Sequence, residues 1–468
     1  PQPFPPQDVQ GSSYPSRRNS NTMGDSMWRV QVSCGASHTA AIIVDCEQRA
    51  SAMFTWGEGE DGQLGQGSND ECTVPTAVAF PDSSVITSVA SGAEHTMAVS
   101  HPAMKVFSWG EGDFGRLGNG NNVDVYVPMV VPALNQVPLV RISCGDNHCL
   151  AILPAKGLLT FGRNQFGQLG LDHTDDMYIP APVPAFAEMK VADLACGAEH
   201  TVAVTDQGEV FAWGWGSYGN LGLGDRAHRS VPTKVPLAHD AATEGKVLQV
   251  ACGWRHSALV TEKGSLYTFG WARWGQIGHQ DNVDRLYAAR VLALEETVVT
   301  KCVGGWRHTM ALTATGKLFA FGWNRFGQLG IGSNNDANTP TQVMTFSKLK
   351  VLDVSCGWRH SVGIVEGPHV YSWGRGASGQ LGHGNNEEVN TPKLIQKIEE
   401  ILTEGPAKYA QRTSSWEKSA RGSVSTRYAA VPSCSGEGFA LAKRQRLGEQ
   451  LVQEVPEIPD IDDAEAVP

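Results

Sequence analysis

The sequence has no run of apolar residues near the roughly 20 that a membrane-spanning helix needs. Residues 1–10 lack the basic start and apolar core of a secretory signal. Positive charge is also scarce, because 37 Lys and Arg stand against 48 Asp and Glu for a formal net charge of −11. This balance argues against a general affinity for DNA phosphates or anionic lipid, and we see no basic N-terminal arm. We therefore expect no membrane partner.

Clustered thiols and catalytic constellations are missing as well. The chain has ten cysteines but no Cys-x-x-Cys pair, the spacing from which many zinc and redox sites are built. The cysteines are therefore expected to be buried thiols in a reducing compartment, with cytoplasmic and nuclear localisation. No Ser/His/Asp or Cys/His arrangement, phosphate-binding loop or metal-ligand spacing is present. We predict neither enzyme activity nor a metal site.

Glycine and tryptophan are abundant, at 52 and 13 of 468 residues, and they belong to an internal repeat. After each repeat's Gly-x-x-His element come an aromatic-Gly pair and a Gly-x-Leu/Ile-Gly turn such as Gly62-Gln63-Leu64-Gly65. Short β-rich segments flank turn residues such as Asp206-Gln207-Gly208, which is a hairpin signature. The Gly-x-x-His element recurs at intervals of 52 to 57 residues, with its histidine at His38, His95, His148, His200, His256, His308 and His360.

Each repeat supplies about four short strands, too few to bury both of their faces alone. Seven repeats closing into a ring predict an all-β, seven-bladed β-propeller over residues 28–398. Residues 1–27 are rich in Pro, Ser, Asn and Gln and are expected to be disordered. Residues 399–468 are predicted to be a flexible tail, whose acidic end after Arg446 suits an interaction segment.

The repeats act as their own control, since positions shared by all seven serve packing and turns. The two positions before each histidine differ between blades. In blades one to four they are Ala36-Ser37, Ala93-Glu94, Asp146-Asn147 and Ala198-Glu199, and in blades five to seven Trp254-Arg255, Trp306-Arg307 and Trp358-Arg359. Equivalent positions on adjacent blades share one face, so we predict three clustered indoles with guanidinium groups beside them. Surface aromatics that merely pack locally are the alternative.

A second set of varying residues lies two positions after the aromatic of each aromatic-Gly pair. It reads Glu58, Glu111, Arg163, Trp215, Trp271, Trp323 and Arg375. Blades one and two carry further acidic side chains at Glu60, Asp61 and Asp113. Blades five and six carry further basic side chains at Arg273 and Arg325. One half of the face is thus acidic and the other basic and aromatic. A two-fold axis would lay unlike halves together, which predicts a homodimer.

The seven-fold Gly-x-x-His and Trp-Gly-x-Gly-x-x-Gly-Gln-Leu-Gly pattern resembles the regulator-of-chromosome-condensation family of propellers. Three Gly-Trp-Arg-His motifs, starting at Gly253, Gly305 and Gly357, resemble the plant ultraviolet-B photoreceptors of that family. The resemblance implies a dark homodimer that has no bound cofactor and uses intrinsic tryptophan as its chromophore. Ultraviolet-B absorption would break cation–π contacts and salt bridges across the interface and release monomers.

The resemblance also implies roles for individual residues. Trp254 and Trp306 would be the principal sensing pair and Trp358 the third member, with Trp215, Trp271 and Trp323 as supporting aromatics. Across the dimer, Arg307 would pair with Asp113 and Asp124. The remaining residues that we place at this interface are Arg255, Arg359, Arg325, Arg163, Glu199, Glu60, Asp61 and Glu111. Glu111 stands where the photoreceptors have a tryptophan, and Ser217 where an arginine is expected, which puts the strength of the dimer in question.

In the tail, Val431-Pro432 follows Arg427-Tyr428-Ala429-Ala430 and matches the family's Val-Pro segment. This segment implies that the monomer binds the WD-repeat domain of a photomorphogenesis-repressing ubiquitin ligase. WD-repeat regulators that restore the dimer are further expected partners, and chromatin is a further candidate. Two alternatives stay open, a guanine-nucleotide exchange factor for a Ran-type GTPase and a passive scaffold.

Overall fold

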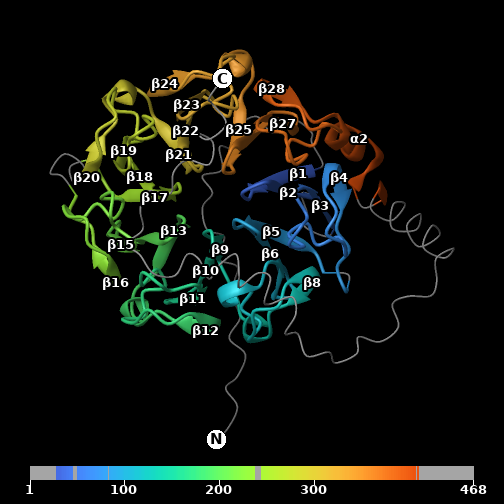
Figure 1. Cartoon of the computed structure of the whole chain (residues 1–468), viewed down its shortest axis with the longest axis horizontal. Coiled ribbons are helices and arrows are strands. Elements are labelled where there is room, and N and C mark those ends of the chain that lie inside the picture. Colours follow the sequence, from blue (N-terminus) through green and yellow to red (C-terminus); the bar gives the residue numbers. More distant parts are fainter. Residues whose placement is uncertain (1–27, 46–49, 83, 238–243, 407, 410–468) are drawn as a thin grey trace, which may run out of the picture. The chain divides into compact units, whose positions relative to one another are not determined.

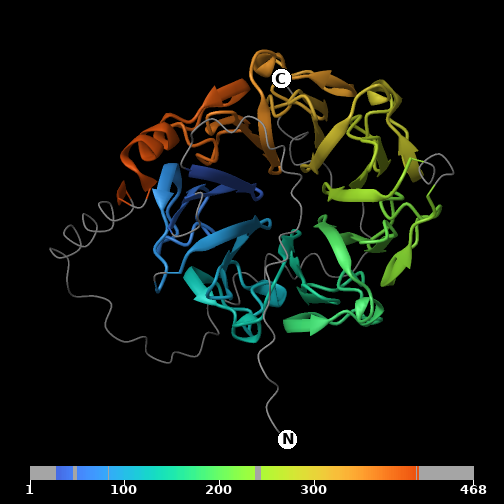
Figure 2. The same ribbon diagram turned by 180° about the vertical axis from the view of Figure 1, so that it is seen from behind.

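The computed structural model describes residues 28–45, 50–82, 84–237, 244–406 and 408–409. These residues form seven four-stranded antiparallel sheets arranged around a common axis (Figure 1). The view from behind shows the same ring (Figure 2). The predicted all-β, seven-bladed propeller is therefore confirmed.

Within each blade the strands follow chain order from the axis to the rim (Figure 1). Blades one and two contain β1 (Trp28–Cys34), β2 (His38–Asp45), β3 (Ser51–Gly57), β4 (Cys72–Ala77), β5 (Ile86–Ser91), β6 (His95–Ser100), β7 (Lys105–Gly110) and β8 (Val125–Val130). Blades three and four contain β9 (Arg141–Cys144), β10 (His148–Ile152), β11 (Leu158–Gly162), β12 (Met177–Pro182), β13 (Val191–Cys196), β14 (His200–Thr205), β15 (Val210–Gly214) and β16 (Arg229–Lys234).

The other three blades repeat this pattern. Blades five and six contain β17 (Val247–Cys252), β18 (His256–Thr261), β19 (Leu266–Gly270), β20 (Arg285–Arg290), β21 (Val299–Gly304), β22 (His308–Thr313), β23 (Leu318–Gly322) and β24 (Ala337–Gln342). Blade seven contains β25 (Val351–Cys356), β26 (His360–Val365), β27 (His369–Gly374) and β28 (Val389–Leu394). The described residues also form 3₁₀ helices at Asp113–Gly115, Pro132–Leu134, Pro184–Phe186, Leu292–Leu294 and Met344–Phe346, and the α-helix α2 (Gln396–Glu404).

The second and third strands of each blade are largely buried, because neighbouring blades cover both of their faces. All six residues of β14, His200–Thr205, are buried, and the strand pairs with β13 and β15. The outermost strand β16 has no buried residue and carries polar side chains. This gradient explains why the apolar signal in the sequence is strongest directly after each repeated histidine.

The ring closes between blades seven and one through side chains. Thr39 Oγ1 lies 2.9 Å from His360 Nε2, and the Trp56 indole donates to the Gln380 carbonyl over 2.9 Å. Helix α2 covers this junction, since its buried Ile398 and Ile401 belong to one apolar cluster with residues of both blades. The predicted boundary between propeller and tail, at residues 398 and 399, falls inside α2. The packed part of the chain therefore extends beyond that boundary.

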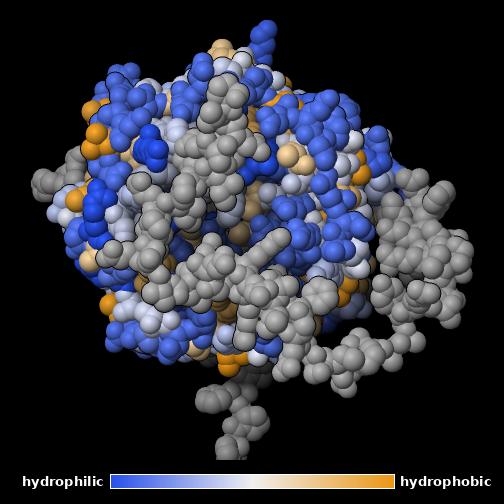
Figure 3. All heavy atoms as spheres, viewed as in Figure 1, coloured by the Kyte–Doolittle hydropathy of each residue, from blue (hydrophilic) through white to orange (hydrophobic). Residues whose placement is uncertain are grey.

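Exposed apolar side chains are spread along the rim. They occur on outer strands at Tyr126, Val127, Tyr178, Ile179, Val231 and Tyr287. In the space-filling view the hydrophobic residues form separate small patches around a mainly hydrophilic surface (Figure 3). No helix among the described residues is long and apolar enough to cross a membrane.

Candidate functional site

The repeated Gly-x-x-His element forms the tight turn between the first and second strands of each blade. Gly305 is required there because a Cβ atom would lie 2.2 Å from Cε1 of His308. His308 Nε2 in turn lies 3.1 Å from the Ser361 hydroxyl of the next blade. Burial lowers the pKa of His308 to about 3, so its imidazole is neutral. The seven histidines, all fully buried, therefore join neighbouring blades.

The turns of adjacent blades meet around the axis, which brings the three predicted indoles together. The backbone N–H of Trp254 donates to the Gly305 carbonyl over 3.1 Å and fixes the spacing of two turns. The ring centroids of Trp254 and Trp306 are 5.5 Å apart at an interplanar angle of 64°. Trp306 and Trp358 are 5.8 Å apart and nearly parallel, at 19°. Trp306 is thus the central ring of a contacting triad.

Arginine side chains stack on these rings. Cζ of Arg307 lies 3.8 Å from the Trp306 ring centroid, and Cζ of Arg359 lies 4.6 Å from the same centroid. Arg255 lies 4.0 Å from Trp254, and burial lowers the pKa of its guanidinium. Cation–π contacts contribute roughly 0.5–2 kcal/mol, and more when desolvated. Arg307 is 7% exposed, so its contact with Trp306 belongs to the stronger end of this range.

The supporting aromatics pack around the triad because each follows the third strand and returns to the same turn. The backbone N–H of Trp271 donates to the Arg255 carbonyl over 2.9 Å. The Trp271 ring lies 5.7 Å from Trp254, and the Trp323 ring lies 5.7 Å from Trp306. Trp215 contacts Arg255 at 4.1 Å. The predicted tryptophans of blades four to seven therefore form one connected cluster.

The opposite half of this face, on blades one to four, holds buried carboxyl groups. Burial and the nearby charges of Glu58, Asp61 and Glu111 raise the pKa of Glu94 well above its ordinary value. Burial, followed by the Glu199 carboxylate, raises the pKa of Asp146 to about 7. The acidic side chains of blades one and two therefore lie close together, and Asp146 and Glu199 add carboxyl groups on blades three and four.

The Gly-x-x-His turns of all seven blades also line a cavity of about 80 Å³ on the axis. Organic ligands commonly occupy pockets of about 300–1,000 Å³. The arrangement of the face is therefore suited to absorbing light through indole and to binding a charged surface, and its axial cavity is too small for an organic chromophore.

Comparison with known proteins places this geometry in a family. The RCC1-like domain matches residues 7–245, and the regulator of chromosome condensation (RCC1) repeat matches residues 263–312, 315–364 and 369–403. The chain belongs to the RCC1 repeat family. It is 46% identical over 368 residues to the Ultraviolet-B receptor UVR8 of Arabidopsis thaliana, which covers 78% of this chain and 81% of that protein. The resemblance to a plant ultraviolet-B receptor is therefore shown.

The other relatives have lower sequence identity to this chain. The human E3 ubiquitin-protein ligase HERC2 is 33% identical over 71% of this chain, which spans only 7% of HERC2. Among solved structures, human WBSCR16 gives a TM-score of 0.66 at 25% identity, covering 74% of this chain and 94% of that one. Yeast RCC1 (Prp20), solved bound to Kap60, gives a TM-score of 0.64 at 24% identity, covering 73% and 83%. At that identity the likeness shows the fold alone.

Several residues that we expected at a dimer interface contact other residues of the same propeller. Glu111 forms an ion pair with Arg116, whose side chain is 2% exposed. Arg163 Nη1 lies 3.9 Å from Glu199 Oε1. Asp124 Oδ1 accepts a hydrogen bond from the Gly112 N–H over 2.9 Å, which fixes the turn of blade two.

The predicted contacts of Arg307 with Asp113 and Asp124 of a second copy remain a prediction. Asp61 and Asp113 are half-buried, whereas Glu60 and Arg325 are exposed. Val431 and Pro432 lie outside the described residues, as do residues 1–27.

The structure adds aromatic residues that we did not predict from the sequence. Trp274 lies 6.3 Å from Trp323, and Tyr218 lies between Trp215 and Trp271 at 5.3 and 5.5 Å. A signal for them exists, because an aromatic residue directly precedes the Gly-x-Leu/Ile-Gly turn in five consecutive blades. These residues are Phe114, Phe166, Tyr218, Trp274 and Phe326.

Proposed function

We propose that this protein is an ultraviolet-B photoreceptor in which Trp254, Trp306 and Trp358 are the chromophore. The observation that carries the proposal is the position of Trp306, which contacts both other indoles within 6 Å and has two guanidinium groups against it. Rings this close share excitation, so light absorbed by the surrounding tryptophans reaches the centre. The family resemblance to an ultraviolet-B receptor supports the same role.

The dark state is a homodimer held through this face. A two-fold axis would place Arg307, Arg255 and Arg359 of one copy against the acidic blades of the other, and the reverse. Excitation of Trp306 disturbs the indole on which Arg307 rests, so the guanidinium loses one of the contacts that orient it. Exposed ion pairs contribute only about 0–1 kcal/mol each, so losing a few of them separates the subunits.

The interface should be weaker than one with an aromatic residue in place of Glu111. The Glu111 carboxylate is already engaged with the buried Arg116 of its own blade. Its charge is therefore largely compensated before any partner arrives. This departure affects dimer strength and leaves the indole cluster in place.

Output passes through the tail rather than through catalysis on the ring. The released monomer presents Val431-Pro432 to the WD-repeat domain of a photomorphogenesis-repressing ubiquitin ligase, as a short segment inserted into a preformed groove. The Ran-type exchange-factor hypothesis has only the shared fold in its support.

The deciding experiment is the sedimentation of the purified full chain before and after ultraviolet-B at low salt. We expect a dimer that becomes a monomer on irradiation and re-forms in darkness. A species of unchanged mass and unchanged tryptophan fluorescence would overturn the proposal.

A further inference from the structure

The junction of blades two and three departs from a contact that the other six junctions share. At those junctions the Nε2 atom of the repeated histidine lies 2.7–3.1 Å from the hydroxyl that follows the histidine of the next blade. These hydroxyls belong to Thr39, Thr96, Thr201, Ser257, Thr309 and Ser361. Only at the junction of blades two and three is the hydroxyl replaced by a thiol, with His95 Nε2 lying 3.0 Å from Cys149 Sγ.

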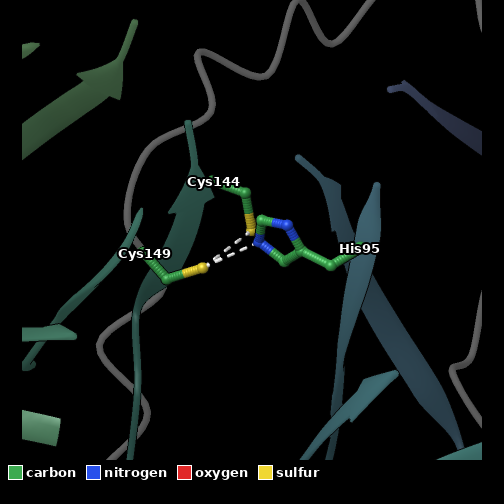
Figure 4. Close-up of side chains that lie close together, drawn as sticks. All are labelled: His95, Cys144 and Cys149. Carbon is green, nitrogen blue, oxygen red and sulfur yellow. Dashed lines mark hydrogen bonds between the residues drawn. The ribbon is translucent and has the colours of Figure 1, made fainter. Parts of the chain in front are cut away.

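The replacement places two thiols and an imidazole together. Cys149 on β10 is directly paired with Cys144 on β9, and their Sγ atoms are 3.6 Å apart. The ligand atoms of His95, Cys144 and Cys149 all lie within 4.8 Å of one another. Figure 4 shows the three side chains converging from two blades. The cross-strand partner of Cys196 in blade four is Thr201, so that strand pair brings only one thiol to the corresponding position.

The geometry points to a binding site for one thiophilic d¹⁰ cation, Zn²⁺ or Cu⁺, held by His95 Nε2, Cys144 Sγ and Cys149 Sγ. Metal–sulfur bonds of about 2.3 Å and metal–nitrogen bonds of about 2.0–2.1 Å require ligand atoms roughly 3.5–4 Å apart. Small rotations of the side chains reach that spacing. Thiolate and imidazole are also the donors that select these two soft or borderline ions.

The imidazole already has the protonation state that a metal requires, whereas burial raises the pKa of the Cys149 thiol well above its ordinary value, so the metal must displace that proton. Burial lowers the pKa of His95 well below its ordinary value, so the imidazole is neutral and able to bind a metal. Its Nδ1 atom is buried and has no hydrogen-bond partner among the described residues, so the Nε2 proton can move there with the loss of only the contact to Cys149. Zn²⁺ binding releases both thiol protons to solvent and leaves a complex with no net charge.

The axial cavity provides a route by which a metal ion can reach the site. His95 and Cys149 are at most 1% exposed, but Cys144 lines the 80 Å³ axial cavity. A water molecule needs about 10–15 Å³ of such space, so one can complete a four-coordinate zinc. Cu⁺ is satisfied by the three protein donors alone. This site is independent of the proposed light response, because none of its residues belongs to the indole cluster.

The test is metal titration of the reduced, metal-free full chain in darkness. Zn²⁺ competes against a chromogenic chelator, Cu⁺ against bathocuproine disulfonate, and Co²⁺ reports thiolate ligation through its charge-transfer band. Since the chain has ten cysteines, the measured quantity is the difference between the wild type and matched variants. Cys149→Thr restores the hydroxyl found in the other blades, and Cys144→Ser reproduces Ser91 of blade two. Cys196→Ser removes a neighbouring thiol outside the site.

We expect one equivalent of Zn²⁺ or Cu⁺ to bind the wild type and Cys196→Ser, and to be lost or weakened at least about tenfold in Cys149→Thr and Cys144→Ser. Zinc binding alone or copper binding alone assigns the ion. Circular dichroism establishes that all four proteins are folded. Equal binding by the wild type and Cys149→Thr, or binding of neither ion, overturns the inference. The light response of the indole cluster is measured separately and is expected to be unchanged in every variant.

Discussion

Trp358 of blade seven donates a hydrogen bond from its indole Nε1 to Oδ1 of Asp146 in blade three, over 3.4 Å and 212 positions of sequence. Both residues line the axial cavity, so this contact joins the aromatic half of the face to the acidic half. Burial raises the pKa of Asp146 to about 7, whereas the hydrogen bond from Trp358 opposes that rise. Asp146, which accepts the hydrogen bond from Trp358, therefore changes its charge near neutral pH.

Asp146 gives the first prediction. A folded-state pKa above the ordinary 3.8 means that the native protein binds a proton more tightly than the unfolded chain between about pH 4 and 7. The contribution of Asp146 to stability is therefore present at low pH and lost as the pH rises through this window. Asp146→Asn should remove this pH dependence. As the pH rises from 4 to 8, the free energy of unfolding of the variant should therefore increase by about 1–3 kcal/mol relative to that of the wild type.

Measuring the difference is necessary because the buried histidines act in the opposite sense. Burial lowers the pKa of His256 and His360, for example, from 6.5 to about 3, so their contribution is lost as pH falls below about 6.5. Urea unfolding of both proteins at several pH values provides the test. Parallel stability profiles for the wild type and Asp146→Asn would contradict the shifted pKa.

Arg307 gives the second prediction. Arg307→Ala should weaken the proposed dimer by about 2–5 kcal/mol. The substitution removes a largely buried charge and leaves the acidic groups proposed to face it without a partner. Raised salt should weaken the wild-type dimer as well, since charges are screened over about 10 Å at 0.1 M. Lys234→Ala, which removes the same charge from the rim, serves as the control in sedimentation. A fully dimeric Arg307→Ala protein at low concentration would exclude this interface.

The residues of this face differ in how far the sequence reveals them. Trp254, Trp306 and Trp358 could be predicted to meet, because the repeat assigns them equivalent positions on adjacent blades. The ion pair of Glu111 with Arg116 could not, since it depends on side-chain directions within one turn. The contact of His95 with Cys149 crosses two blades, and ligand spacing along the chain does not show it.

Helix α2 shows a different kind of omission. It follows the last repeat, so repeat comparison alone assigned its residues from Glu399 onward to a flexible tail. The apolar residues Ile398, Ile401 and Leu402 do have helical spacing. Their partners, however, belong to blades seven and one, and these become neighbours only when the ring closes.

The third prediction concerns this helix. Ile401→Ala should destabilise the propeller by about 2–5 kcal/mol, because it opens a cavity at the junction of the first and last blades. Glu400→Ala, at an exposed position of the same helix, should change stability by less than about 0.5 kcal/mol. Denaturant unfolding measures both. Equal stability of the two variants would show that α2 does not hold the ring closed.

The fourth prediction concerns the sensor. Trp306→Phe should keep the propeller and the dimer but abolish dissociation by ultraviolet-B, because phenylalanine retains most of the ring packing and absorbs very little in that band. Trp254→Phe should impair the response, and Trp358→Phe should impair it less. Trp28→Phe, at the start of β1, removes an indole outside the cluster and should respond normally. Normal light-driven monomerisation of Trp306→Phe would refute the assignment.

The fifth prediction separates sensing from output. Changing Val431→Ala together with Pro432→Ala should leave light-driven monomerisation intact and remove binding of the ligase's WD-repeat domain, because the anchoring side chains of the segment are lost. Val455→Ala with Pro456→Ala, at a second Val-Pro pair in the tail, is the matched control and should bind normally. An exchange factor would behave differently, since its activity would reside on the ring and survive both changes. Titrating the WD-repeat domain and assaying Ran nucleotide release with the same preparations therefore decides between the two. Accelerated release without light-dependent ligase binding would favour the exchange factor.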